Sequence, residues 1–122
     1  MNSEQLVNIW FEKWNSGDFM NLPITDSFEH TSPFGIVKGK KAYIDLIKEK
    51  EKENETKFLG YSFELQDTLY KLESACVHYT ARQGPDFCLD VSEWYYFKNN
   101  LIDKVIAYYH IGDIREERLY KS

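Results

Sequence analysis

The sequence lacks any apolar stretch that approaches the roughly 18 residues of a membrane-spanning helix. Its first residues, Met1 to Gln5, are polar and do not have the basic-then-apolar order of a secretory signal. Only two cysteines are present, Cys76 and Cys88, and they lack the C-x-x-C spacing of a zinc or redox motif. We therefore expect a cytoplasmic protein with reduced thiols and no membrane association.

Positive charge is also scarce. The 15 lysines and arginines are outnumbered by 20 aspartates and glutamates, which gives a net charge of -5. An acidic domain repels phosphate backbones, so nucleic acid is not an expected partner. The three histidines have no H-x-x-x-H or similar spacing, and we expect neither a metal nor a cofactor.

Aromatic residues, in contrast, are plentiful. They make up 16% of the 122 residues, in a chain that is 43% hydrophobic and 29% charged. Such a chain is expected to form one globular domain, here 1–122, with a substantial core. The three Trp, nine Tyr and eight Phe exceed what that core needs, so some of them are expected to line a pocket or an interface.

Hydrophobic periodicity places the helices in the first half of the chain. A buried helical face is expected between Ser3 as N-cap and Gly17 as stop, formed by Leu6, Val7, Trp10, Phe11 and Trp14. A short helix at 18–22, a short strand at 24–31 and a turn at 32–35 follow. A helix from Lys40 to about Lys50 is expected next, with Tyr43, Ile44 and Ile47 inward, and the charged run 48–57 reads as its solvated end and a loop.

The second half of the chain has the alternation of β-strands. Alternating stretches cover 58–68, 74–82, 87–97 and 101–111. They are separated by hairpin turns at 83–86 and 98–100. Helices followed by a four-strand antiparallel meander predict an α+β fold.

Four segments carry a resemblance to a known family. They are the stretch Trp10–Phe19 with its Gly-Asp pair, the stretch His30–Gly35 before a helix, the stretch Leu89–Phe97, and Ala107–Tyr109. Their order and spacing resemble the nuclear transport factor 2-like superfamily, in its SnoaL-like and ketosteroid isomerase-like branch, from about residue 5 to 112. The resemblance implies one SnoaL-like domain: a cone-shaped, curved antiparallel sheet wrapped around N-terminal helices, a cystatin-like α+β roll. It also implies a pocket for a small apolar or aromatic molecule.

The same resemblance bears on catalysis. The isomerases have a tyrosine oxyanion donor where this chain has Trp10, and an aspartate base where it has Ser32. Their protonated acid in the fifth strand corresponds to Glu93, which is the one chemical match. Without the base and the tyrosine, steroid isomerisation is not expected.

Strand alternation predicts which side chains face the pocket. With Glu93 inward, a tight turn at 83–86 sets Glu93 opposite Cys76 and turns His78 inward, whereas a slip of one residue brings Val77 and Tyr79 inward instead. The isomerase resemblance favours the first register. The expected acid/base set is then Glu93, His78 and His30, with ligand-binding residues Trp10, Trp14, Phe28, Ser32, Phe34, Thr80, Val91, Tyr95 and Tyr109.

These groups have structural interpretations too. An inward histidine is often a hydrogen-bonded core residue, the tryptophans also fill a core, and Ser32 before Pro33 fits turn chemistry. Two hypotheses of function therefore stay open. One is a cofactor-free cyclase, isomerase or dehydratase in which a histidine–Glu93 pair moves a proton. The other is a non-catalytic domain in which the same groups only orient a ligand.

The opposite face of the predicted sheet is apolar as well. In the favoured register it carries Val77, Tyr79, Trp94, Tyr96, Ile106 and Tyr108. Because a monomer rarely leaves such a patch in water, we expect a homodimer through this face, as is common in the superfamily. That register also places Cys76 and Cys88 on opposite faces, so no disulfide between them is expected.

Overall fold

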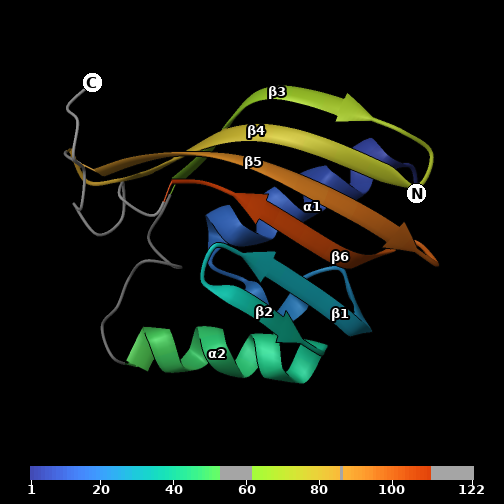
Figure 1. Cartoon of the computed structure of the whole chain (residues 1–122), viewed down its shortest axis with the longest axis horizontal. Coiled ribbons are helices and arrows are strands. Elements are labelled where there is room, and N and C mark those ends of the chain that lie inside the picture. The colour runs from blue at the N-terminus through green and yellow to red at the C-terminus, as the bar shows by residue number, and fades with distance from the viewer. Residues whose placement is uncertain (53–61, 86, 111–122) are drawn as a thin grey trace.

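The computed structural model describes residues 1–52, 62–85 and 87–110. Figure 1 shows how the helices and the strands are arranged. In chain order they are α1 (Ser3–Ser16), the 3₁₀ helix η1 (Phe19–Asn21), β1 (Ile24–Ser32), β2 (Gly35–Lys38), α2 (Lys40–Lys52), β3 (Ser62–Tyr70), β4 (Ser74–Gln83), β5 (Phe87–Lys98) and β6 (Leu101–Tyr108). The predicted α+β class is confirmed. Residues 58–61 and 111 of the predicted strands, and 53–57 of the charged run, lie outside the described residues.

Helix α1 is closed at both ends by its own sequence. Asn2, not Ser3 as predicted, is the N-cap: its side chain accepts a hydrogen bond from the Gln5 amide at 2.9 Å, and the Gln5 side chain accepts one from the Asn2 amide at 2.9 Å. The Ser3 hydroxyl instead donates to the Lys71 carbonyl, which ties the helix to the β3–β4 turn. Gly17 ends the helix with a φ of 75°, a left-handed value that favours glycine.

The six strands form one open, curved sheet in the order β2-β1-β6-β5-β4-β3. Strands β3 to β6 form the predicted antiparallel meander. The curved antiparallel sheet that the resemblance implied is extended by β1, which lies parallel to β6, so the sheet is mixed. Strand β2 was not predicted; it pairs with β1 across the expected turn after Ser32.

The hairpin turns fix the register of the sheet. Asn99 and Asn100 have φ values of 53° and 62°, and two successive positive values are what a two-residue hairpin turn needs. The β4–β5 connection is longer: Gln83 pairs with Phe87, so three residues join the strands. Pro85 excludes the type I′ turn seen at Asn99–Asn100, because its ring holds φ near roughly −65° and that turn needs two positive φ values.

This longer connection corrects the favoured register by one residue. Glu93 lies opposite Val77 and Val91 lies opposite Tyr79, as in the alternative register. Val77 and Tyr79 are therefore buried, and His78 faces the outside. Cys76 and Cys88 lie on the same outer face, contrary to prediction, but at distant positions along the strands, so both are free.

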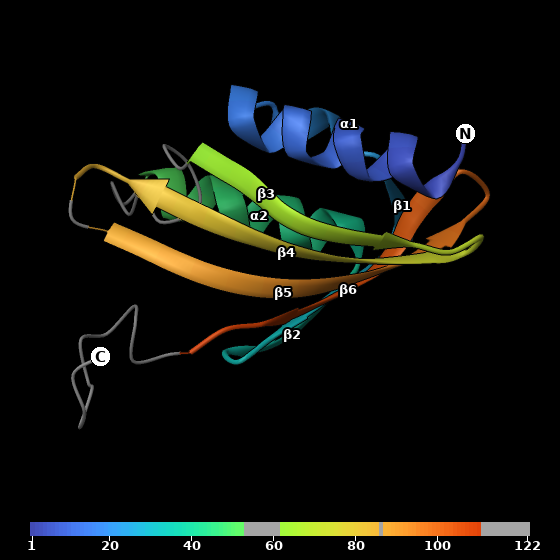
Figure 2. The ribbon, with the colours of Figure 1, turned by 90° about the horizontal axis from the view of Figure 1, so that it is seen from above.

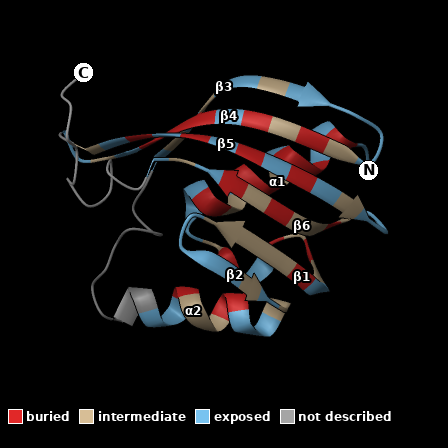
Figure 3. Cartoon of the chain, viewed as in Figure 1, coloured by how far each residue is buried: buried red, intermediate tan, exposed pale blue. Residues whose placement is uncertain are grey.

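Both helices cover the same side of the sheet (Figure 2). We call this side the concave face and the other side the outer face. Burial alternates along the strands (Figure 3), and on β5 every second residue from Leu89 to Tyr95 is buried. The core thus lies between the concave face and the helices, where α1 contributes Val7, Trp10, Phe11 and Trp14 and α2 contributes Tyr43, Ile44 and Ile47, as predicted.

Candidate functional site

The centre of the candidate site is the carboxyl group of Glu93. Strand β5 points this side chain to the concave face, where it is only 3% exposed. The Tyr79 hydroxyl donates a hydrogen bond to Oε2 at 3.0 Å, and the Tyr95 hydroxyl donates one to Oε1. Both donors come from the same face of β4 and β5, so strand alternation alone brings the three groups together.

Burial decides the acidity of this carboxyl. Loss of water raises the pKa of Glu93 from its ordinary value of 4.5 to about 7, even though hydrogen bonds from Tyr95, Tyr79 and Trp10 favour the ionised form. In turn, burial and the nearby Glu93 charge raise the pKa of Tyr79 and Tyr95 well above 10. At neutral pH the tyrosines are therefore neutral donors, and Glu93 is present in both protonation states.

Aromatic rings surround the carboxyl. The Trp10 ring lies 6.0 Å from the Tyr95 ring in an edge-to-face arrangement, and the Phe11 ring lies 5.0 Å from the Tyr79 ring in the same arrangement. Trp10 also contacts Phe28 on β1 at 6.1 Å. The enclosure is apolar except for the hydroxyl and indole donors, which is the environment that shifts a carboxyl pKa upward.

A second set of polar side chains comes from three other segments: His30 on β1, Tyr43 on α2 and Tyr109 directly after β6. The imidazole of His30 stacks on Tyr43 at 5.2 Å, and burial lowers its pKa from 6.5 to about 4, so His30 is neutral at pH 7. Tyr43 and Tyr109 both lie close enough to Glu93 for its charge to raise their pKa, after the larger effect of burial. Ser32 hydrogen-bonds to Tyr109, and its Oγ also accepts from the Phe34 amide at 3.2 Å.

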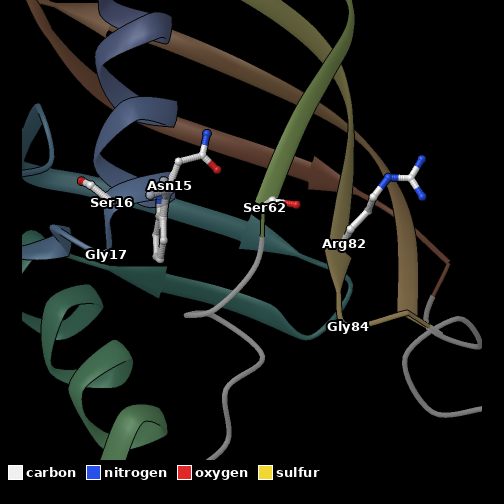
Figure 4. A pocket seen from close by; sticks show the side chains of 7 residues that line it. Asn15, Ser16, Gly17, Ser62, Arg82 and Gly84 are labelled. Carbon is white, nitrogen blue, oxygen red and sulfur yellow. The ribbon is translucent and has the colours of Figure 1, made fainter.

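A pocket of about 610 Å³ lies at one end of the sheet (Figure 4). We call this end of the sheet the mouth. Described residues that line it come from the last turn of α1, the start of β3 and the end of β4: Trp14, Asn15, Ser16, Gly17, Ser62, Arg82 and Gly84. Glu93 does not line this pocket. The two are linked by aromatic contacts, because Phe63 lies 6.3 Å from Trp14 and 5.6 Å from Tyr79, which in turn donates to Glu93.

The structure places most of the predicted site residues on the concave side. Glu93, Trp10, Trp14, Phe28, Val91 and Tyr95 belong to the core, and His30, Ser32 and Tyr109 are half-buried beside it. Phe34 is exposed in the β1–β2 turn, where it contacts the Tyr109 ring at 6.2 Å.

Two predicted site residues do not reach the concave side. His78 is exposed on the outer face, with Nε2 3.5 Å from Asp90 Oδ1. Thr80 shares that face and donates to Asp90 at 2.8 Å. Their predicted inward orientation is wrong because the three-residue β4–β5 connection shifts the register, so no His78–Glu93 pair exists.

Two residues of the site were not predicted. Tyr79 belongs to the alternative register, in which Val77 and Tyr79 face inward. Pro85 is the one local signal for that register, because it excludes a type I′ turn between β4 and β5. Tyr43 was predicted only as a core residue of α2, and nothing in its spacing distinguishes it from Ile44 or Ile47.

The described ranges 1–52, 62–85 and 87–110 lack two further features. In those ranges no three His, Cys, Asp or Glu side chains gather as a metal site. Within the same part of the chain, neither helix has the length and apolar character to cross a membrane.

Comparisons with known proteins place this fold. No family model matches the chain, and no curated protein matches its sequence. Solved structures do. An NTF2-like protein of unknown function from Cytophaga hutchinsonii has a TM-score of 0.78 at 13% identity, covering 94% of this chain and 96% of that one. A SnoaL-like protein of unknown function from Burkholderia thailandensis has a TM-score of 0.70 at 23% identity, over 88% and 92% of the two chains.

An enzyme is among the similar structures. The LEH-like epoxide hydrolase of Mycobacterium tuberculosis has a TM-score of 0.71 at 13% identity, covering 92% of this chain and 85% of that one. All three similarities show the fold, which is the NTF2-like, SnoaL-like α+β fold that the resemblance implied. A fold that hosts several activities does not specify one, so the function has to be argued from Glu93 and its surroundings.

Proposed function

We propose that this protein binds a small, largely apolar molecule on the concave side of the sheet and that Glu93 exchanges a proton with it. One observation carries the proposal: a carboxyl group is shielded from water, held by two tyrosine hydroxyls, and has its pKa near 7. A carboxyl with such a pKa can act as an acid or a base at neutral pH. Perturbed titration of this kind is concentrated at functional sites.

The surroundings of Glu93 support an apolar ligand with few polar atoms. Tyr43 and Tyr109 face the carboxyl from α2 and the end of β6. His30 stacks on Tyr43 and is neutral, so it offers one donor and one acceptor without charge. Apolar walls with a few convergent polar groups are typical of small-molecule sites.

The structural neighbours support chemistry on this fold without naming a substrate. One of them is an epoxide hydrolase, and others are candidate polyketide cyclases. In this chain Ser32 stands where the isomerases have their aspartate base, so steroid isomerisation is not proposed. The proton would instead pass between the substrate and Glu93, with Tyr79 and Tyr95 stabilising the ionised carboxylate.

A non-catalytic binding function is the second candidate, and one observation favours it. Both Glu93 oxygens already accept a tyrosine hydrogen bond. A carboxyl that is saturated in this way can serve to hold Tyr79 and Tyr95 in place around a ligand. The two candidates differ in whether Glu93 only orients the ligand or also takes its proton.

Exchange of carbon-bound hydrogen separates the two candidates. We would incubate 2-tetralone, a neutral bicyclic ketone, in D₂O and follow loss of its benzylic proton signal by NMR. If Glu93 takes that proton and returns a deuteron, Glu93→Gln should slow protein-catalysed exchange roughly 10²-fold or more. Glu73→Gln removes the same charge from an exposed position in the β3–β4 turn and serves as the matched control.

Each result has a distinct meaning. Binding without accelerated exchange, seen as shifts of the Tyr79 and Glu93 amide resonances, would support the non-catalytic function. Equal exchange in wild type and Glu93→Gln would contradict the catalytic role of Glu93. If 2-tetralone neither binds to the protein nor undergoes faster exchange in its presence, that result counts against the proposed site.

We also propose a homodimer through the outer face. One cross-strand row runs over all six strands there, because the paired residues are Leu69, Cys76, Trp94, Ile106, Thr31 and Ile36. Trp94 is 38% exposed, and Tyr96 and Tyr108 stand beside it. Burying such side chains contributes about 1.5–3 kcal/mol each, which supports self-association.

Sedimentation tests the dimer. At micromolar concentration the wild type should have twice the 14.5 kDa chain mass, and Trp94→Glu should convert it to a monomer. Leu72→Glu is the control, because Leu72 is exposed at the β3–β4 turn, outside the row. A monomeric wild type, or a dimer that Trp94→Glu leaves intact, would overturn the proposal.

A further inference from the structure

The outer face of β5 carries one charge of each sign. Exposed residues alternate with inward-facing ones along this strand, and the exposed positions from Asp90 to Lys98 form one line (Figure 3). The exposed residues between these two, Ser92, Trp94 and Tyr96, are uncharged. Trp94 is the middle residue of the line, with the carboxylate four residues before it and the ammonium group four residues after it. The two charges therefore lie at similar distances from Trp94, in opposite directions.

Both charged groups are accessible to another chain. The Asp90 side chain is 68% exposed, and its contacts with Thr80 and His78 both use Oδ1. Lys98 is exposed at the last position of β5. Asp103 of β6 is within electrostatic range of Lys98, but it already accepts two hydrogen bonds from β1.

A two-fold dimer through this face can place β5 on its own copy in two ways. In a parallel arrangement each residue lies opposite its copy, so Asp90 meets Asp90 and Lys98 meets Lys98. In an antiparallel arrangement, residues equally far before and after Trp94 lie opposite each other. Asp90 of each protomer then meets Lys98 of the other, and the pair occurs twice.

The spacing of the charges suits the packing of two sheets. Sheets that pack face to face lie about 10 Å apart, with their strands inclined by about 30°. Four residues along a strand cover about 13 Å, so at Asp90 and Lys98 the inclination separates the two strands sideways by about 7 Å. The long flexible stem of a lysine allows its ammonium group to bridge that separation.

From this symmetry we infer that the second protomer lies antiparallel across β5, with Asp90 of each chain paired to Lys98 of the other. The inference rests on the proposed homodimer and adds its orientation. Charges at the rim of an interface select between orientations, because like charges placed opposite each other are penalised. The uncharged centre around Trp94 fits either orientation, so Asp90 and Lys98 make the choice.

The neighbouring strand fits the same orientation. Ile106 of β6 pairs with Trp94, and Lys104 and Tyr108 stand two residues to either side of Ile106. In the antiparallel arrangement Lys104 therefore lies opposite Tyr108 of the other protomer. The Tyr108 side chain is 58% exposed, and an ammonium group over an aromatic face is attracted to it.

The orientation also decides where the two pockets lie. The mouth is at the end of β4, close to the start of β5, so Asp90 lies towards the mouth and Lys98 towards the other end of the sheet. Antiparallel protomers thus have their mouths at opposite ends of the dimer. In the parallel arrangement both mouths would lie at the same end.

Charge exchange tests the orientation, with the dimer dissociation constant of the whole chain measured by sedimentation. Asp90→Lys and Lys98→Asp each replace two attractive pairs with two repulsive ones, so each should weaken the dimer by about tenfold or more. The double variant restores both pairs with the charges exchanged, and its dissociation constant should return to within about threefold of the wild-type value. Glu12→Lys is the matched control: it makes the same charge change on the exposed side of α1, across the sheet from the outer face, and should leave the dimer unchanged.

Neutralisation distinguishes the two arrangements by the direction of its effect. Asp90→Asn removes an attraction from the antiparallel dimer and should weaken it, whereas it would remove a repulsion from a parallel dimer and tighten it. A tighter Asp90→Asn dimer, single reversals without effect, or a double variant that stays weak would overturn the antiparallel pairing and leave the proposed homodimer intact. A monomeric wild type would overturn both.

Discussion

The two faces of the β4–β5 hairpin hold carboxyl groups in comparable ways but at different depths. On the concave face, Glu93 accepts from the hydroxyls of Tyr79 and Tyr95. On the outer face, Asp90 accepts from Thr80 at 2.8 Å and lies 3.5 Å from His78, but its side chain is 68% exposed. Burial raises the pKa of Glu93 to about 7, although its hydrogen bonds favour the ionised form. At Glu93, removal of water is therefore what makes the carboxyl a weak acid, and the hydrogen bonds oppose that shift.

The largest expected effect comes from placing one polar residue on each face. Val77→Asn would bury an amide with no partner and lose apolar burial, which should lower the free energy of unfolding by about 3–5 kcal/mol. His78→Asn, at the next residue, removes only an exposed contact with Asp90. It should change the free energy of unfolding by about 0.5 kcal/mol or less. Urea denaturation of both variants measures the difference, and equal losses would show that the register is wrong.

The next effect concerns how the free energy of unfolding depends on pH. Glu93 and His30 make opposite contributions to this dependence. Between pH 4.5 and 7 the unfolded chain loses the Glu93 proton while the folded protein keeps it, so this group lowers stability as pH rises, by about 3 kcal/mol in total. Between pH 6.5 and 4 the unfolded chain protonates His30 while the folded protein does not, so stability falls by a similar amount as pH falls, about 3 kcal/mol. The two slopes oppose each other from pH 4.5 to 6.5.

Single variants separate these slopes. In that range the stability of Glu93→Gln should rise with pH, that of His30→Gln should fall, and that of the wild type should stay nearly level. Thermal or urea unfolding at half-unit pH steps provides the measurement. A wild type and a Glu93→Gln variant with the same pH profile would mean that Glu93 titrates in the folded protein as it does in water.

The smallest expected effect comes from removing one hydroxyl on each face. Tyr79→Phe removes a donor to the ionised form of Glu93, so the pKa of Glu93 should rise further and stability at pH 8 should fall by about 1 kcal/mol. Thr80→Val removes a donor to exposed Asp90 and should not move the Glu93 titration. Carboxyl carbon shifts of Glu93, followed by NMR against pH, distinguish the two; a rise in both variants would contradict the separation of the faces.

Sequence reasoning predicted most of the fold because helix spacing and strand alternation are local signals. The caps at Asn2 and Gly17 lie within one residue of the predicted ends, and Asn99–Asn100 is a turn that its two residues specify. The parallel contact of β1 with β6 was missed, because it joins distant segments and leaves no periodic mark in either.

The candidate site was harder to predict than the fold. Glu93 and Trp10 were placed together from the resemblance, and the structure brings them together. His78 was predicted to face inward, but Tyr79 occupies that position and His78 faces outward. The reason is one extra residue in the β4–β5 connection, which turns every β4 side chain to the other face. The resemblance indicated a protonated acid at Glu93, but the size of its pKa shift could not be read from the sequence, since it depends on rings from α1, α2 and β4 that meet only in the folded chain.

The parallel pairing of β1 with β6 also has a consequence for the order of folding. Strand β1 carries Phe28 and His30 and comes early in the chain, but its partner in the middle of the sheet is the last strand described. The β1–β2 hairpin and α2 can form locally, but they can pair with the rest of the sheet only after β6 has formed. Such distant pairing closes a long loop and slows folding. The contacts that Tyr43 of α2 and Phe28 of β1 make on the concave side are therefore expected to form last, in one step that joins α2 and β1 to the meander.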